Sequence, residues 1–216
     1  MMETPKSKDV ILDVAERLFA RKGYEGTSMR SIAEEAHVAQ GLIHYHWKTK
    51  EQLFESIVER RSSEINQARE RMLSSCFRYA AAGRPSLEQI VESFVRPAIE
   101  QGHSSSGEHF SQILAMFANS NDERSKELVH KYYDPIARKY IEAMQKILPH
   151  LSLSEIYWGY LMATSVVVSS MARTGRIKRL SEGVFEDDDV EQIIHRLVLF
   201  IANGFHGLSA RVATEV

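Results

Sequence analysis

The spacing of apolar residues is helical through almost the whole chain, and this periodicity limits the fold more than any other feature of the sequence. The first clear case occupies positions 11, 14, 15, 18 and 19, which lie on one face of an amphipathic helix. Only five prolines and eleven glycines occur in 216 residues, so long segments contain no helix breaker. No segment shows the apolar–polar alternation of a strand. We therefore predict an all-α protein with about nine helices.

The most informative segment covers residues 27–50, where two short helical patterns are separated by a tight break. Thr27 or Ser28 caps the first pattern, the break falls at His37, and the second pattern covers residues 39–47. The second pattern is dense in side chains that can contact DNA. This arrangement is typical of a helix-turn-helix with its recognition helix, so it predicts sequence-specific DNA binding rather than catalysis.

Individual roles follow from the chemistry of the side chains. Gln40 is the best candidate for reading a base, because its amide can pair bidentately with adenine. Gly41 allows close approach of the backbone, and Leu42 could meet a thymine methyl group. Phosphate contacts, which fix the register on DNA, are predicted for Thr27, Tyr45, His46, Lys48 and Thr49. The small core that holds the two helices together is predicted to consist of Ile32, Val38, Ile43 and Trp47.

Residues 11–59 resemble the N-terminal DNA-binding domain of the TetR family of transcriptional regulators. The matching elements are Ala15, Leu18, Phe19 and Gly23-Tyr24; Thr27-Ser28-Met29-Arg30; Ile32-Ala33; Val38, Gly41 and Ile43; and Lys48-Thr49-Lys50-Glu51-Gln52-Leu53. With this resemblance, the predicted DNA-binding set is Thr27, Ser28, Arg30, Ala39, Gln40, Gly41, Leu42, His44, Tyr45, His46, Lys48, Thr49 and Lys50.

The chain departs from the family pattern in three places. His37 stands where the family usually has a turn glycine, His44 where it has tyrosine, and Trp47 where it has phenylalanine. Histidine tolerates a positive φ better than most residues, so the turn is expected to persist. His44 can donate to a phosphate in place of the tyrosine hydroxyl.

The helical pattern predicts two domains, a helix-turn-helix domain over residues 1–50 and a larger helical domain over residues 51–216. The resemblance implies that the second domain encloses a small-molecule pocket and that the protein is a repressor released from its operator by a ligand. Aromatic and methionine walls with few charges suit an apolar or amphipathic ligand. The predicted pocket residues are Phe94, Phe110, Leu114, Phe117, Tyr133, Trp158 and Met162.

A homodimer is expected from two features. The helical patterns at residues 154–173 and 187–209 have apolar stripes too wide for packing on one side only, so two copies could form a four-helix bundle. The predicted interface residues are Val166, Ser170, Ile194, Leu197, Val198, Ile201 and Phe205. In addition, residues 1–50 contain eight Lys/Arg and seven Asp/Glu, a weak positive balance for a DNA-binding domain. Two recognition helices about 34 Å apart would read a palindrome and supply the missing affinity.

Two other classes of function are alternatives to a DNA-binding regulator. A helical enzyme is disfavoured because the sequence contains no triad spacing, phosphate loop or H-E-x-x-H motif, and no cofactor or metal is expected. A helical carrier of an apolar ligand that does not bind DNA remains an alternative; Gln40→Ala and Tyr45→Ala would separate it from a regulator.

The remaining features favour a cytoplasmic protein. Cys76 is the only cysteine, which excludes an intrachain disulfide and suits a reducing compartment. The polar N-terminus lacks the apolar core of a signal peptide. The longest apolar-leaning run, residues 161–172, is shorter than the roughly 20 residues that span a bilayer.

Overall fold

A computed structural model describes residues 5–105, 107–186 and 188–209. The predicted all-α class is confirmed, because these residues form eleven α-helices, one 3₁₀ turn and no strand. None of the described helices combines the length and the apolar character that a transmembrane span requires. The helices are α1 (Pro5–Lys22), α2 (Met29–Glu35), α3 (Gln40–His46), α4 (Lys50–Tyr79), α5 (Leu87–His103), α6 (Glu108–Phe117), α7 (Glu123–Tyr132), α8 (Asp134–Ile147), α9 (Leu153–Met171), α10 (Arg176–Leu180) and α11 (Val190–Ser209), with the 3₁₀ turn at Ala81–Gly83.

The number of helices exceeds the predicted nine for two local reasons. The sequence predicts helix over residues 122–148 with Pro135 as the candidate interruption, and the structure divides this segment into α7 and α8, where Pro135 lacks an N–H and occupies the first turn of α8. The connection before the last helix contains the short α10, which follows Gly175 in a left-handed conformation. The last helix begins at Val190 rather than at residue 187, which lies outside the described residues.

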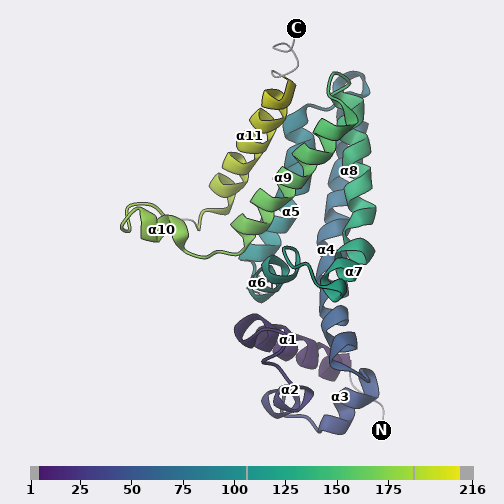
Figure 1. Ribbon diagram of the computed structural model, residues 1–216, viewed down its shortest axis with the longest axis vertical. Helices are drawn as coiled ribbons and strands as arrows, with labels where there is room; N and C mark the ends of the chain where they lie inside the picture. The colour runs from purple at the N-terminus through teal and green to yellow at the C-terminus, as the bar shows by residue number, and fades with distance from the viewer. Residues whose placement is uncertain (1–4, 106, 187, 210–216) are drawn as a thin grey trace.

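The helices form two lobes that share α4 (Figure 1). Helices α1, α2 and α3 lie together at one end of the molecule, and α4 runs from them into the larger lobe. There α4 packs against α5, α7 and α8, while α11 packs against α5 and α9. The short α10 stands away from both lobes.

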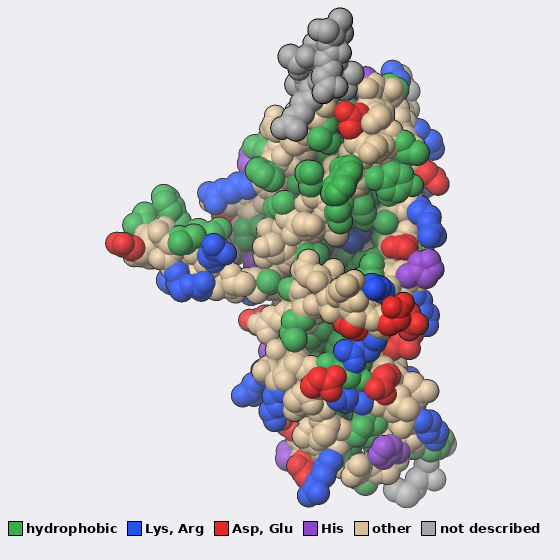
Figure 2. All heavy atoms as spheres, in the orientation of Figure 1, with side chains coloured by type: hydrophobic (Ala, Val, Ile, Leu, Met, Phe, Trp, Pro, Cys, Tyr) green, Lys and Arg blue, Asp and Glu red, His purple; other side chains and the backbone are tan. Residues whose placement is uncertain are grey.

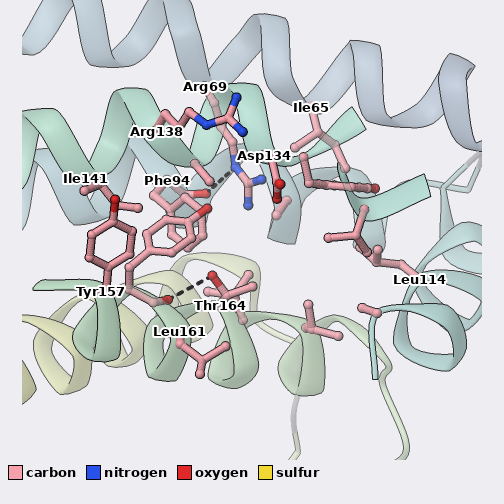
Figure 3. A pocket seen from close by; sticks show the side chains of 18 of the residues that line it. Ile65, Arg69, Phe94, Leu114, Asp134, Arg138, Ile141, Tyr157, Leu161 and Thr164 are labelled. Atoms are coloured by element: carbon pink, nitrogen blue, oxygen red, sulfur yellow. Dashed lines mark hydrogen bonds between the residues drawn. The ribbon is translucent and has the colours of Figure 1, made fainter. Parts of the chain in front are cut away.

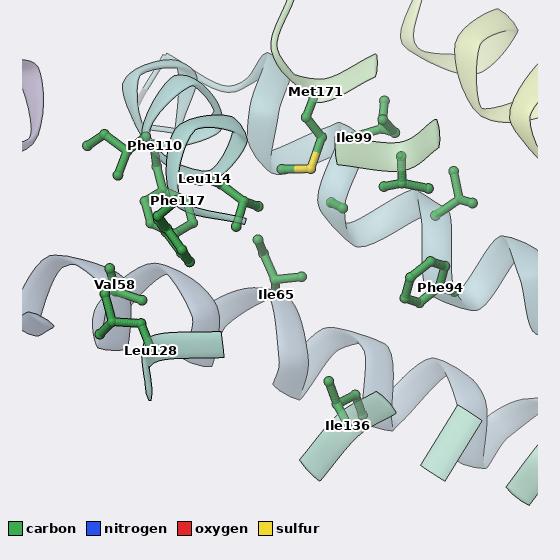
Figure 4. Close-up of a cluster of buried hydrophobic side chains, with 14 of the residues drawn as sticks. Val58, Ile65, Phe94, Ile99, Phe110, Leu114, Phe117, Leu128, Ile136 and Met171 are labelled. Carbon is green, nitrogen blue, oxygen red and sulfur yellow. The ribbon is translucent and has the colours of Figure 1, made fainter. Parts of the chain in front are cut away.

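An aromatic cluster joins the two lobes. Phe54 of α4 lies 5.0 Å from Phe19 and 5.2 Å from Tyr24, between ring centroids, and both contacts are edge-to-face. On its other side Phe54 meets Phe117 of α6 at 6.4 Å. Figure 4 shows Phe117 beside Phe110 and Leu114, so α6 presents three apolar side chains to the core near α4 and α5. The small lobe is therefore held against the base of the large one by aromatic packing.

The predicted dimer interface requires correction. Ile194, Leu197, Val198, Ile201 and Phe205 are all buried within the single chain, where α11 packs against α5 and α9. Of the other two predicted residues, Val166 and Ser170 are half-buried. The large apolar side chains that α9 and α11 leave exposed are not the predicted ones. They are Leu153, Tyr157, Trp158, Leu161 and Met162 on α9, and Leu199 and Phe200 on α11.

A glycine sets the close contact between α9 and α11. A Cβ added at Gly159 would lie 2.3 Å from Cε1 of the buried Phe205 ring, whereas one added at Gly204 would meet no atom within 4 Å. Both glycines lie inside helices, so replacing either one by alanine raises helix propensity by a similar amount. This gain therefore cancels when the stabilities of the two variants are compared. We expect Gly159→Ala to have a free energy of unfolding about 1–3 kcal/mol below that of Gly204→Ala, because the ring cannot move freely. Urea denaturation of the two variants checks this; equal stabilities would contradict it.

Candidate nucleic-acid interface and ligand cavity

Local hydrogen bonds define the helix-turn-helix. Ser28 caps α2, because its hydroxyl accepts from the Ser31 N–H at 3.0 Å while Ser31 Oγ accepts from the Ser28 N–H at 3.1 Å. The turn is closed by the Val38 N–H, which donates to the Ala33 carbonyl at 3.0 Å. His37 has a φ of 54°, so the expectation that histidine would adopt the turn conformation usually given to glycine is confirmed.

The predicted scaffold of this motif is largely confirmed. Ile32 and Ile43 are completely buried and Trp47 is nearly so, while Val38 is half-buried against the same core. The indole N–H of Trp47 donates to Ser56 Oγ of α4 at 2.9 Å. This contact joins the C-terminal end of α3 to α4.

The outer face of α3 carries the side chains predicted to meet DNA. Gln40, Gly41, His44 and Tyr45 are all exposed, and Tyr45 presents 66% of its surface to solvent. Gln40 Nε2 and His44 Nε2 lie 3.4 Å apart, one helical turn from each other. A Cβ at Gly41 would meet nothing within 4 Å, so the backbone here is open to a ligand. The exposed Ala39, Lys48 and Thr49 continue the same segment, and we name the set Ala39, Gln40, Gly41, His44, Tyr45, Lys48 and Thr49 the α3 face.

Two predicted DNA contacts require correction. Thr27 is 1% exposed, and its hydroxyl donates to the carbonyls of Leu18 and Gly23 inside the lobe. Lys50 turns away from α3: its Nζ donates to the Tyr24 carbonyl at 2.9 Å and lies 4.2 Å from the centre of the Tyr24 ring. Both side chains therefore stabilise the lobe in this structure.

The remaining predicted contacts have mixed surroundings. Leu42 and His46 are half-buried, with Leu42 packed on the core and the His46 ring 5.3 Å from that of Tyr45. Arg30 is exposed and forms an ion pair with Glu34 at 2.9 Å. Ser28 and Thr49 cap α2 and α4. The N–H of Lys48 donates to Gln52 Oε1 at 2.9 Å, so part of the predicted anion site is filled by the chain itself.

A cavity of about 760 Å³ lies in the large lobe (Figure 3). Of the predicted pocket residues, Phe94, Leu114, Tyr133 and Trp158 line it. The structure places Phe110 and Phe117 in the core instead, and Met162 is exposed on α9. The walls come from α4, α5, α6, α7, α8 and α9, and include Ile65, Ala98, Ala118, Val129, Ala137, Ile141, Tyr157, Tyr160, Leu161, Thr164, Val167, Val168 and Met171.

The cavity also contains charged residues that the sequence interpretation missed, Arg69, Asp134 and Arg138. Arg69 is 6% exposed; its Nε donates to the Phe94 carbonyl at 2.9 Å, and its guanidinium carbon lies 4.2 Å from the centre of the Phe94 ring. A signal for this residue existed, because position 69 lies four residues after Ile65 and four before Leu73, on the apolar stripe of α4. Burial lowers the pKa of the Arg69 guanidinium from its usual value.

Two buried tyrosines lie near this arginine. The Tyr140 hydroxyl donates to the Arg69 carbonyl at 3.3 Å and lies 3.0 Å from Ser93 Oγ. The Tyr133 hydroxyl is buried and has no hydrogen-bond partner among the residues that the structure describes. Burial raises the pKa of both hydroxyls, so both are protonated at neutral pH and can donate.

A helix-turn-helix lobe with an open recognition face, joined by one helix to a lobe that encloses a cavity, defines a DNA-binding transcriptional regulator. Comparison with known families gives the same class. Residues 11–57 match the family described as bacterial regulatory proteins, tetR family. Residues 92–204, more than half of the chain, match the family described as tetracyclin repressor-like, C-terminal domain. The chain belongs to the TetR family.

Individual relatives cover the chain unevenly. The HTH-type transcriptional regulator AcrR of Shigella flexneri is 42% identical over 65 residues, which is 30% of each protein. IcaR of Staphylococcus aureus, a negative transcriptional regulator of the biofilm operon icaADBC, is 26% identical over 139 residues, 59% of this chain and 69% of IcaR.

Solved structures show the same fold at low identity. A TetR-family transcriptional regulator from Bordetella parapertussis has a TM-score of 0.69 at 14% identity, covering 95% of this chain and 98% of that one. FadR from Bacillus subtilis, solved with stearoyl-CoA, has a TM-score of 0.56 at 16% identity, covering 91% and 98%.

Proposed function

We propose that this protein is a cytoplasmic, homodimeric repressor that leaves a palindromic operator when an amphipathic ligand enters the cavity. It acts by binding and not by catalysis. The observation that carries the proposal is the continuity of α4. This helix begins at Lys50, directly after the α3 face, and contributes Ile65 and Arg69 to the cavity.

The length of α4 explains how the two sites communicate. Its 30 residues extend about 45 Å, and a helix of this length moves largely as a rod. A ligand that favours a different position of α4 at the cavity therefore also favours a different position of α3, which Trp47 ties to α4. If the two recognition helices of a dimer lose the spacing of the operator, affinity for DNA falls.

The exposed apolar side chains support the dimer. Hydrophobic side chains gather over α9, and others lie on the projecting segment around α10 (Figure 2). The exposed ones are Leu153, Tyr157, Trp158, Leu161 and Met162 on α9, Leu199 and Phe200 on α11, and Ile177, Leu180, Val184 and Phe185 on the projecting segment. So large an exposed apolar surface is typical of a protein interface. The match to IcaR, described as a negative regulator, supports repression.

Binding to DNA tests the proposal directly. Selection from a random duplex library should return an inverted repeat, and binding to it should weaken steeply with salt. Phe200→Asp should convert the protein to a monomer in sedimentation experiments and weaken operator binding at least 100-fold, because one recognition helix replaces two. Tyr79→Asp serves as the control, because Tyr79 is an aromatic residue of α4 that is at least as exposed as Phe200. A library without enrichment, or tight operator binding by the Phe200→Asp monomer, would refute the proposal.

A further inference from the structure

The strongest unexplained feature of the large lobe is the charge of Arg69. The side chain is 94% buried in a cavity whose walls are mainly aliphatic and aromatic. A guanidinium remains protonated at any physiological pH, so the cavity contains a permanent positive charge. Figure 3 shows the Arg69 guanidinium directed into the cavity, beside Phe94.

No counter-charge accompanies this arginine in the described part of the chain. No carboxylate oxygen of the described residues lies within 4.0 Å of the Arg69 guanidinium. Asp134 also lines the cavity, but its carboxylate lies 2.9 Å from His130 Nδ1 and belongs to a largely exposed pair. The other buried arginine of α4, Arg61, is instead paired with Glu16 at 2.9 Å.

The hydrogen bonds of Arg69 are also incomplete. Among the described residues only Nε of Arg69 has an acceptor, the Phe94 carbonyl, which leaves the two terminal nitrogens available to donate to a ligand. The Tyr133 hydroxyl lines the same cavity, is buried, and has no hydrogen-bond partner within the described part of the chain. The two groups interact electrostatically, because the positive charge of Arg69 lowers the pKa of Tyr133 against the larger effect of burial. A buried guanidinium without a counter-ion and a buried hydroxyl without a hydrogen-bond partner, both judged among the described residues, indicate an absent acceptor.

We propose that the cavity binds an amphipathic organic acid, whose single carboxylate accepts hydrogen bonds from Arg69 and Tyr133. Arg138 also lines the cavity, but its side chain is exposed to solvent, so Arg69 carries the buried positive charge. A carboxylate matches this one guanidinium in charge and in geometry, whereas a phosphate dianion would bring a second negative charge that Arg69 alone does not balance. The apolar body of the acid lies against Phe94, Trp158 and Leu161, toward the partly exposed aromatic side chains of α9. This inference rests on the proposed function for its regulatory meaning, but ligand binding can be measured without DNA.

Calorimetric titration with matched probes tests the charge requirement. Straight-chain carboxylates of six to sixteen carbons are compared with their methyl esters, which keep the apolar body and lose the charge. We expect at least one carboxylate to bind the wild-type protein and its ester to bind more than tenfold more weakly, as expected for hydrogen bonds to a charged group. Arg69→Gln should lose more than tenfold in carboxylate affinity with little change for the ester. Tyr133→Phe should bind the carboxylate a few-fold more weakly than the wild type, and Arg69→Lys should retain part of the carboxylate affinity.

Stability supplies an independent measurement. Because an unpaired buried charge destabilises the ligand-free protein, Arg69→Met should melt no lower than wild type in the absence of ligand and should gain no stability from the carboxylate. Esters that bind as tightly as acids, acids that never bind, or unchanged carboxylate affinity in folded Arg69→Gln would overturn the proposal. Carboxylate binding that depends on Arg69 but does not release DNA would refute the regulatory function and leave the binding site intact.

Discussion

Gln40→Ala should weaken binding to the selected operator by roughly 30-fold to 10⁴-fold. A bidentate side chain–base pair contributes about 1–3 kcal/mol of discrimination, and a symmetric dimer loses the pair twice. Gln40 is exposed in the first turn of α3, so the substitution removes no packing contact and should not change the melting temperature. Fluorescence anisotropy at one fixed salt concentration measures the effect.

The matched control is Gln145→Ala, an exposed glutamine of α8 far from the α3 face in the sequence. It should bind the operator as the wild type does. Binding to random DNA should hardly change in Gln40→Ala, because phosphate contacts carry non-specific affinity. An equal loss for operator and random DNA would show that Gln40 does not read a base.

Glu16→Ala should lower the free energy of unfolding by about 3–5 kcal/mol, the usual cost of removing one partner from a buried ion pair. Glu16 is 2% exposed, and its Oε2 accepts from Arg60 and from Arg61, each at 2.9 Å. Arg60 keeps a bond to Asp13, and Arg61 keeps one to Glu64. These exposed acids compensate only in part, so the effect should fall in the lower half of the range. Urea denaturation measures it.

A second ion pair of the same lobe provides the control. Glu35 accepts from Arg17 at 2.8 Å, but both side chains are more than a third exposed. Glu35→Ala should therefore cost no more than about 1 kcal/mol. Similar losses in the two variants would mean that burial does not set the strength of the Glu16 contacts.

Features set by local sequence were predictable. Ser28, one of the two cap residues that the sequence offers, caps α2. Gly23, with a φ of 72°, ends α1, and Thr49 caps α4; glycine and threonine are favoured at these positions. The turn at His37 belongs to the same group. Each depends on interactions between residues a few positions apart, which spacing and residue type reveal.

Features set by distant contacts were not predictable. Lys50 appeared to belong with Lys48 on the DNA side, but the carbonyl of Tyr24, 26 positions away, binds it. The apolar stripe of α11 was interpreted as a dimer surface, yet it packs on α5 and α9 of the same chain. An apolar stripe indicates that one face of a helix is buried, but it does not indicate which other helix packs against that face. Arg69 is different, because its position four residues from both Ile65 and Leu73 on the apolar stripe of α4 already indicates burial.

The continuity of α4 has a consequence for the response of a cell. If the ligand lowers affinity for the operator by some factor, the operator lowers affinity for the ligand by the same factor, because the two bindings are linked. Repressor molecules bound to DNA then have a lower affinity for the ligand than molecules free in solution, so the free molecules are filled with ligand first. The ligand concentration that induces a gene would then depend on how tightly that gene's operator binds the regulator, and two operators of different affinity would respond at different ligand concentrations.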